Sequence, residues 1–201
     1  MKIVRFYDNT GSLHLGALKE ERGTQAYIVE GDLFTSFRVT DRLASVVRLT
    51  APLQPVQVLA VGLNYRRHAE ETGAKLPERP EIFMKAVTSV VGPGEPIYLP
   101  QAGPDEVDYE GELAVIIGKR AKNVSADRAQ DYIFGYCCAN DVSARDWQWR
   151  KQQSQWIRAK SFDTFCPLGP AVVTKDEIDN PDNLSIETQL NGRTVQQSST
   201  A

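Results

Sequence analysis

The chain has 201 residues, of which 41% are hydrophobic and 24% are charged, and its formal net charge at pH 7 is -3. This composition is typical of a globular protein with a buried core, and its scattered basic residues offer no electrostatic surface for nucleic acid. No apolar run approaches the roughly 20 residues needed to span a bilayer, and the first residues lack the apolar stretch of a signal peptide. We therefore expect a cytoplasmic protein without a nucleic-acid or membrane partner.

Short apolar runs separated by turn residues make up the first part of the chain. We expect strands at residues 2–7, 13–18 and 25–29, because each run is bounded by residues such as Asp, Asn and Gly. These strands predict a small N-terminal β domain over residues 1–50. The prolines at 52 and 55 then suit an extended linker that leads into a second unit, residues 51–201.

The second unit alternates short strands with a few short helices. Asn191 and Gly192 separate two strand-like runs and indicate a hairpin with a type I′ turn. Because this last hairpin leaves strands without a partner, we expect the core to be incomplete at residue 201. Together the pattern predicts a mostly-β (α+β) fold. The predicted strands lie at residues 56–61, 82–85, 96–99, 106–118, 134–140, 185–190 and 193–196, and the predicted helices at 65–72, 126–132 and 143–151.

Three carboxylates are candidates for a metal site. Glu110 and Glu112 lie in the predicted strand 106–118, where alternate side chains share a face, and two like charges there repel unless a cation lies between them. A solvated edge strand is the alternative. Asp141 follows another strand, where it could bind the same cation or simply cap the next helix. Three oxygen ligands favour Mg²⁺, Mn²⁺ or Ca²⁺ over softer metals.

His68 and Glu71 are three residues apart on a predicted helix and therefore share a face. A carboxylate that binds one ring nitrogen of a histidine raises the basicity of the other, which is the arrangement of a general base. An ordinary solvated pair on a helix surface is the alternative.

Three further polar residues are candidates for contacts with a substrate. Lys160 has aromatic and apolar neighbours, where an ammonium could stabilise an enolate or could simply be a surface charge. Arg145 and Gln148 follow Asp141 at helical spacing and could bind a substrate carboxylate, for which the guanidinium geometry is well suited.

The three cysteines, Cys137, Cys138 and Cys166, are odd in number and form no CxxC motif. Neither a disulfide framework nor a zinc site is indicated. We expect buried, reduced thiols.

The order and the residues of five segments resemble those of the fumarylacetoacetate hydrolase family, over roughly residues 52–201. Members of that family usually continue well past the position of residue 201, through a Gly- and Thr-rich motif. The five segments are Gly62-Leu63-Asn64-Tyr65-Arg66-Arg67-His68-Ala69-Glu70-Glu71, Phe83-Met84-Lys85, Asp108-Tyr109-Glu110-Gly111-Glu112-Leu113, Asn140-Asp141-Val142-Ser143-Ala144-Arg145-Asp146 and Ala159-Lys160-Ser161-Phe162-Asp163.

The resemblance implies a mixed β-roll core, a homodimer and a bound Mg²⁺ or similar ion. By this resemblance the metal ligands are Glu110, Glu112 and Asp141, and the water-activating pair is His68 and Glu71 on a lid that orders over the substrate. Lys160 is then the lysine that stabilises developing negative charge, and Arg145 and Gln148 contact the substrate.

The resemblance also implies a metal-dependent enzyme of aromatic catabolism that acts on small 2-oxo or 1,3-diketo acids. The pair of His68 and Glu71 favours hydrolysis of a carbon–carbon bond in an acylpyruvate-like substrate. The alternatives are an isomerase of 2-hydroxyhepta-2,4-diene-1,7-dioate, an oxo-acid decarboxylase, and a non-catalytic module with a structural ion.

Overall fold

The computed structural model describes residues 1–21, 23–102, 104–151, 153 and 155–201. Strands dominate it, as expected for a mostly-β fold. They are β1 (Lys2–Tyr7), β2 (Leu13–Leu18), β3 (Gln25–Asp32), β4 (Ser36–Ser45), β5 (Arg48–Thr50), β6 (Val58–Gly62), β7 (Glu81–Lys85), β8 (Val90–Val91), β9 (Val107–Asp108), β10 (Gly111–Ile117), β11 (Ile133–Asn140), β12 (Ser143–Ala144), β13 (Cys166–Pro167), β14 (Val172–Thr174), β15 (Ser185–Leu190) and β16 (Arg193–Ser199).

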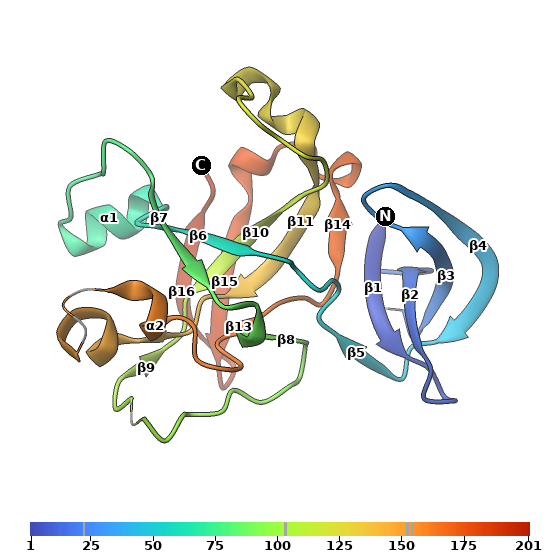
Figure 1. Ribbon diagram of the computed structural model, residues 1–201, viewed down its shortest axis with the longest axis horizontal. Helices are drawn as coiled ribbons and strands as arrows, with labels where there is room; N and C mark the ends of the chain where they lie inside the picture. The colour runs from blue at the N-terminus through green and yellow to red at the C-terminus, as the bar shows by residue number, and fades with distance from the viewer. Residues whose placement is uncertain (22, 103, 152, 154) are drawn as a thin grey trace.

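One eight-stranded sheet runs through both predicted units, in the order β10-β11-β14-β1-β2-β3-β4, with β5 paired to β1. The N-terminal strands join the rest through antiparallel pairing of β1 with β14, where Lys2 lies opposite Val173. Figure 1 shows these strands at the blue end of the chain, beside β14. The boundary near residue 50 stays a prediction, and strands on both sides of it share this sheet.

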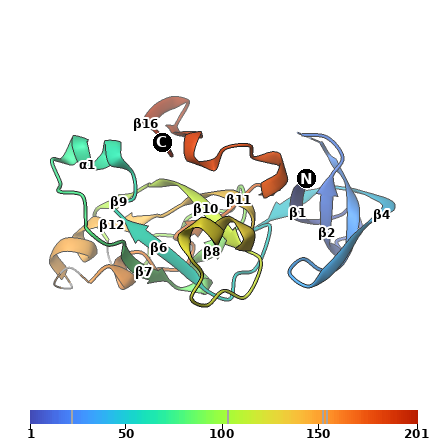
Figure 2. The same cartoon turned by 90° about the horizontal axis from the view of Figure 1, so that it is seen from above.

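The largest buried cluster joins the two parts of the sheet. Ile3 and Val29 from the N-terminal strands pack with Cys137, Leu168 and Val172 from the later ones. Two hairpins flank the β10–β11 pair in Figure 2, β15–β16 on one side and β6–β7 on the other. The β15–β16 turn has positive φ at Asn191 (51°) and Gly192 (75°), as the predicted type I′ hairpin requires.

Helices are short in the described chain. The helix α1 (Arg66–Thr72) ends at Gly73, whose φ of 64° is the left-handed C-cap expected from the sequence. Residues 126–132 form a 3₁₀ rather than an α-helix, and the predicted helix 143–151 is wrong over its first part. There β12 pairs with β9, and a π-helix follows at Trp147–Lys151. The other helices are α2 (Trp156–Ala159) and the 3₁₀ turns Val87–Ser89, Lys175–Glu177 and Pro181–Asn183. No helix in the described part of the chain is both long and apolar enough to cross a bilayer.

Two strand predictions are wrong. Residues 96–99 do not form a strand. In this segment the Tyr98 N–H donates to a side chain, Thr164 Oγ1, at 2.8 Å, and not to a neighbouring strand. The predicted strand 106–118 is interrupted at Tyr109 and Glu110, because β9 pairs with β12 whereas β10 pairs with β11. The strand β4 was not predicted, since its many polar residues hide the alternating pattern.

Candidate active site

The interruption between β9 and β10 determines where the acidic side chains lie. Glu110 falls between the two strands, and its carbonyl accepts a hydrogen bond from the Asp141 N–H at 2.9 Å. The Ser143 hydroxyl, fully buried, lies 3.2 Å from Glu110 Oε1. Glu110 and Asp141 are therefore neighbours because the β10–β11 ladder ends there, not because they share one face of a continuous strand.

The ammonium of Lys160 lies between these two carboxylates. Its Nζ is 2.8 Å from Glu110 Oε2, 2.8 Å from Asp141 Oδ2 and 2.7 Å from Ser143 Oγ. The side chain is only 3% exposed, so the alternative of an ordinary surface lysine is wrong. A buried ammonium with three polar partners is held in one place, because each lost partner would leave its charge uncompensated.

Arg145 links the same cluster to Asp108. Its Nη1 is 2.5 Å from Glu110 Oε1 and 3.0 Å from Gln148 Oε1, while Nε and Nη2 both reach Asp108 Oδ2. The structure thus brings Arg145, Gln148 and Glu110 together, whereas the predicted helical face that Asp141 would share with Arg145 and Gln148 does not form. Asp141 also caps no helix, because β12 follows it.

Glu112 lies apart from the cationic part of the cluster. Its Oε2 accepts a hydrogen bond from Asn64 Nδ2 at 3.0 Å, and the nearby Tyr65 hydroxyl accepts one from the Leu113 N–H. Burial, with smaller contributions from the charges of Glu110 and Asp141, raises the pKa of Glu112 to about 7. Of the three predicted metal ligands, Glu112 is the one without an ammonium or guanidinium contact in the described structure.

Lys85 is a member of the cluster that the sequence reasoning missed. The strand β7 ends with this residue, whose ammonium is 2.6 Å from Asp141 Oδ1. Burial lowers its pKa, against the opposing effect of Asp141. The motif Phe83-Met84-Lys85 contributes to the family resemblance without indicating a role for the lysine. The alternation of side chains along β7 was the available signal, since it places Lys85 on the same inward face as Phe83.

The structure does not bring His68 and Glu71 into the cluster. Both side chains are exposed on α1, and the described residues give neither a hydrogen-bond or ion-pair partner. Their role as a water-activating pair stays a prediction. Figure 1 shows α1 at the left of the molecule, and residues 63–65 join it to β6.

The donor chemistry of Glu110, Glu112 and Asp141 fits a hard divalent cation. All three offer carboxylate oxygens, and the buried Glu112 has no cationic partner of its own, so a cation beside it would favour its charged form. Among the described residues, however, no three His, Cys, Asp or Glu side chains converge as a preformed metal cage. Instead, the oxygens of Glu110 and Asp141 contact the cationic side chains of Lys85, Lys160 and Arg145.

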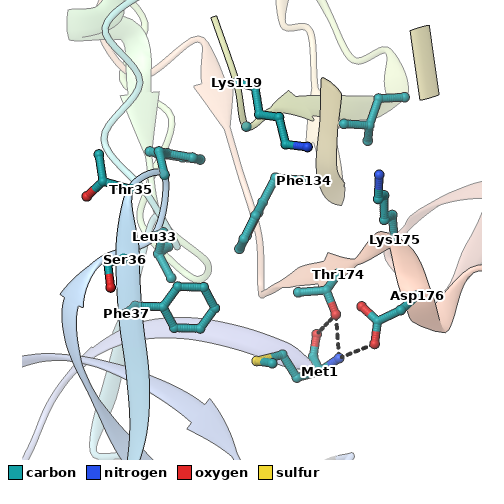
Figure 3. A pocket seen from close by; sticks show the side chains of 13 residues that line it. Met1, Leu33, Thr35, Ser36, Phe37, Lys119, Phe134, Thr174, Lys175 and Asp176 are labelled. Atoms are coloured by element: carbon teal, nitrogen blue, oxygen red, sulfur yellow. Dashed lines mark hydrogen bonds and ion pairs between the residues drawn. The ribbon is translucent and has the colours of Figure 1, made fainter. Parts of the chain in front are cut away.

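A surface cavity lies elsewhere, between the β3–β4 turn and the far end of the β10–β11 pair. Its volume is about 510 Å³, and its lining includes Phe34, Phe37, Phe134 and Lys119 (Figure 3). None of the predicted site residues lines it. We place the functional site at the charged cluster, because it combines several buried ionisable groups of complementary charge.

The family model for the fumarylacetoacetate (FAA) hydrolase C-terminal region matches residues 57–201. The chain belongs to this family. Among its relatives is the mitochondrial oxaloacetate tautomerase fahd2 of Xenopus laevis, which is 48% identical over 157 residues, covering 78% of this chain and 49% of that protein. The chain thus spans about half the length of this curated relative.

Solved structures of the family share the fold over nearly the whole chain. The 5-carboxymethyl-2-hydroxymuconate delta-isomerase of Mycobacterium smegmatis is 39% identical, with a TM-score of 0.85 over 99% of this chain and 76% of its own. The 2-hydroxyhepta-2,4-diene-1,7-dioate isomerase of Mycobacterium marinum is 38% identical, with a TM-score of 0.85 over 100% and 75%. The predicted family and fold class are thereby confirmed.

Proposed function

We propose that this protein catalyses keto–enol isomerisation of small 2-oxo dicarboxylic acids. The observation that carries the proposal is the buried Lys160 ammonium, which lies between two carboxylates and within the same cluster as Arg145. Such a site can stabilise the negative charge that develops on an enolate oxygen. The tautomerase and isomerase names of the relatives support the same reaction class.

The roles follow from the chemistry of each side chain. Arg145 is suited to bind one substrate carboxylate through two parallel hydrogen bonds, for which the substrate would replace one of the protein carboxylates that now contact the guanidinium, and Gln148 orients it. Lys160 would donate a hydrogen bond from Nζ to the 2-oxygen as it becomes an enolate, in exchange for one of the three hydrogen bonds that its ammonium now makes. Because isomerisation needs no activated water, it makes no demand on the exposed His68 and Glu71.

A divalent cation is part of the proposal, with Glu110, Glu112 and Asp141 as its ligands and Mg²⁺, Mn²⁺ or Ca²⁺ as candidates. When bound, it would supply Lewis-acid polarisation of the 2-oxo group. The carboxylates of Glu110 and Asp141 would then contact both the ion and the Lys160 ammonium. We also propose a homodimer, on the basis of the family resemblance.

The test compares three reactions with magnesium and with chelator: loss of the enol absorbance of oxaloacetate, release of pyruvate by decarboxylation, and cleavage of an acylpyruvate. We expect isomerisation to be the fastest, and Lys160→Met to reduce it by about 10²- to 10³-fold, the range for loss of one oxyanion donor. Lys119→Met, which removes an exposed lysine at the remote cavity, is the matched control and should leave the rate unchanged. Faster cleavage or decarboxylation than isomerisation would contradict the proposal.

Hydrolysis of a carbon–carbon bond remains the second candidate, because His68 and Glu71 share one face of α1. For water attack, α1 would have to close over the cluster. His68→Ala separates the two functions: it should reduce acylpyruvate cleavage by about 10²- to 10⁴-fold if His68 is the base, and should spare isomerisation. If the protein instead binds the ion and turns over none of these substrates, the non-catalytic module is the better description.

A further inference from the structure

Lys85 is a deeply enclosed charged side chain of the cluster and has no role in the function proposed above. On β7 the side chains of Ile82 and Met84 are 64% and 46% exposed, whereas Phe83 and Lys85 point inward and Lys85 is 4% exposed. Removing an ammonium from water costs several kcal/mol unless its hydrogen bonds are replaced. This lysine therefore depends on its protein partners.

Those partners belong to the residues on which the proposed chemistry depends. The ammonium of Lys85 donates to Asp141 Oδ1, to the Val142 carbonyl at 3.4 Å and to the main-chain carbonyl of Lys160. Lys160 itself contacts the other oxygen of the same carboxylate, Asp141 Oδ2. Lys85 thus contacts both the backbone of Lys160 and the Asp141 carboxylate, which the Lys160 ammonium also contacts.

Within its own segment Lys160 is held by a backbone hydrogen bond from its N–H to the Trp156 carbonyl at 3.1 Å. It follows α2, a helix of only four residues, and a single short turn is not stable by itself. The β6–β7 hairpin, in contrast, is paired over its whole length, from Val58 opposite Lys85 to Gly62 opposite Glu81. A side chain anchored on this hairpin can therefore fix the position of a loop residue.

We propose that Lys85 is a positioning residue that sets the location of the Lys160 ammonium through the Asp141 carboxylate and the Lys160 carbonyl. Its ammonium contacts the Asp141 carboxylate and the main chain of Lys160, and through these two contacts it acts on Lys160. The catalytic part of this inference rests on the proposed function. The positional part does not, because it concerns the accessibility of Lys160 itself.

The experiment uses Lys85→Met, which removes the ammonium, and Lys85→Gln, which retains an N–H donor and decides the matter should the first variant fail to fold. Val4→Ala, a cavity in the N-terminal cluster far from the site, serves as the control for a general loss of stability. Two readouts are taken: kcat and KM for enol oxaloacetate, and trace acetylation of Lys160 followed by peptide mass spectrometry. The exposed Lys119 calibrates the labelling in every sample.

We expect Lys85→Met to lower kcat by about 10²-fold with KM within about threefold, as when a catalytic group is misplaced by about 1 Å. Acetylation of Lys160, which is 3% exposed in the intact protein, should rise several-fold. Lys85→Gln should show smaller changes, and Val4→Ala neither. Labelling of Lys160 at the wild-type level in both Lys85 variants, or the same changes in Val4→Ala, would overturn the proposal. If the wild type turns over no oxo acid, the proposed function fails, and the labelling contrast alone decides the role of Lys85.

Discussion

Arg145 donates two hydrogen bonds to a single oxygen of Asp108, from Nε at 3.2 Å and from Nη2 at 2.9 Å. Because Nη1 points to Glu110 at the same time, the planar guanidinium is fixed in orientation. A lysine has no equivalent planar fork. The predictions below begin from this pair.

Arg145→Lys should raise KM for oxaloacetate about tenfold or more and change kcat less, because lysine cannot bind a carboxylate through two parallel bonds. The pair with Asp108 is partly exposed, so the free energy of unfolding should fall by only about 1 kcal/mol or less. Steady-state kinetics and denaturant unfolding check the two parts. Unchanged KM would remove Arg145 from the substrate site.

The ionisation of Glu112 should make the stability of the fold depend on pH. Its folded pKa of about 7 lies above the value of 4.5 taken for an unperturbed glutamate, so between these values the folded state binds more protons than the unfolded state. Stability should therefore fall as the pH rises from about 4.5 to 7, by about 1–3 kcal/mol, since one pKa unit corresponds to about 1.4 kcal/mol. Denaturant unfolding in the presence of chelator measures this. In Glu112→Gln this part of the pH dependence should disappear, and an unchanged slope would assign it to another group.

Glu110→Gln should weaken binding of Mg²⁺ or Mn²⁺ and reduce turnover while the fold is retained. The amide offers only a neutral oxygen, and hard cations prefer carboxylates. Calorimetric titration with Mn²⁺ is the measurement, with Glu106→Gln as a control on an exposed acid that forms an ion pair with Arg150. Wild-type affinity in Glu110→Gln would exclude Glu110 as a ligand.

The three thiols should react at very different rates. Cys138 is exposed, whereas Cys137 and Cys166 are buried, and burial raises the pKa of Cys137 to about 12. Since the thiolate is the reactive form, iodoacetamide at pH 8 should modify Cys138 at least about tenfold faster than the others. Peptide mass spectrometry reads the result, and all three should react in denaturant. Equal rates in the native protein would mean that β11 opens readily.

Local patterns identified many of the elements that the structure contains. Gly73 predicted the end of α1, and Asn191 with Gly192 predicted the last hairpin, because positive φ is a property of single residues and needs no tertiary context. The expectation of buried thiols held for Cys137 and Cys166 and was wrong for Cys138, since one of two adjacent residues in a strand must face the opposite side.

Features that depend on pairing between distant segments were not predictable. Nothing near Tyr109 indicates that the strand breaks there, because the break arises from the choice of β12 and β11 as separate partners. Lys85 was missed for a related reason. A lysine becomes a buried residue only when a carboxylate from a distant segment, here that of Asp141, lies beside it.

The pairing of Lys2 with Val173 also governs how the chain can fold. During synthesis β1 meets β14 only after more than 150 further residues have been made. Until then the beginning of β1 lacks its partner strand, although its later residues can already pair with β5, and such an open edge can pair with other chains. Contacts so distant in sequence also slow folding, because a long loop must close before they form. Nascent chains of this protein should therefore depend on protection from aggregation until β14 has been made.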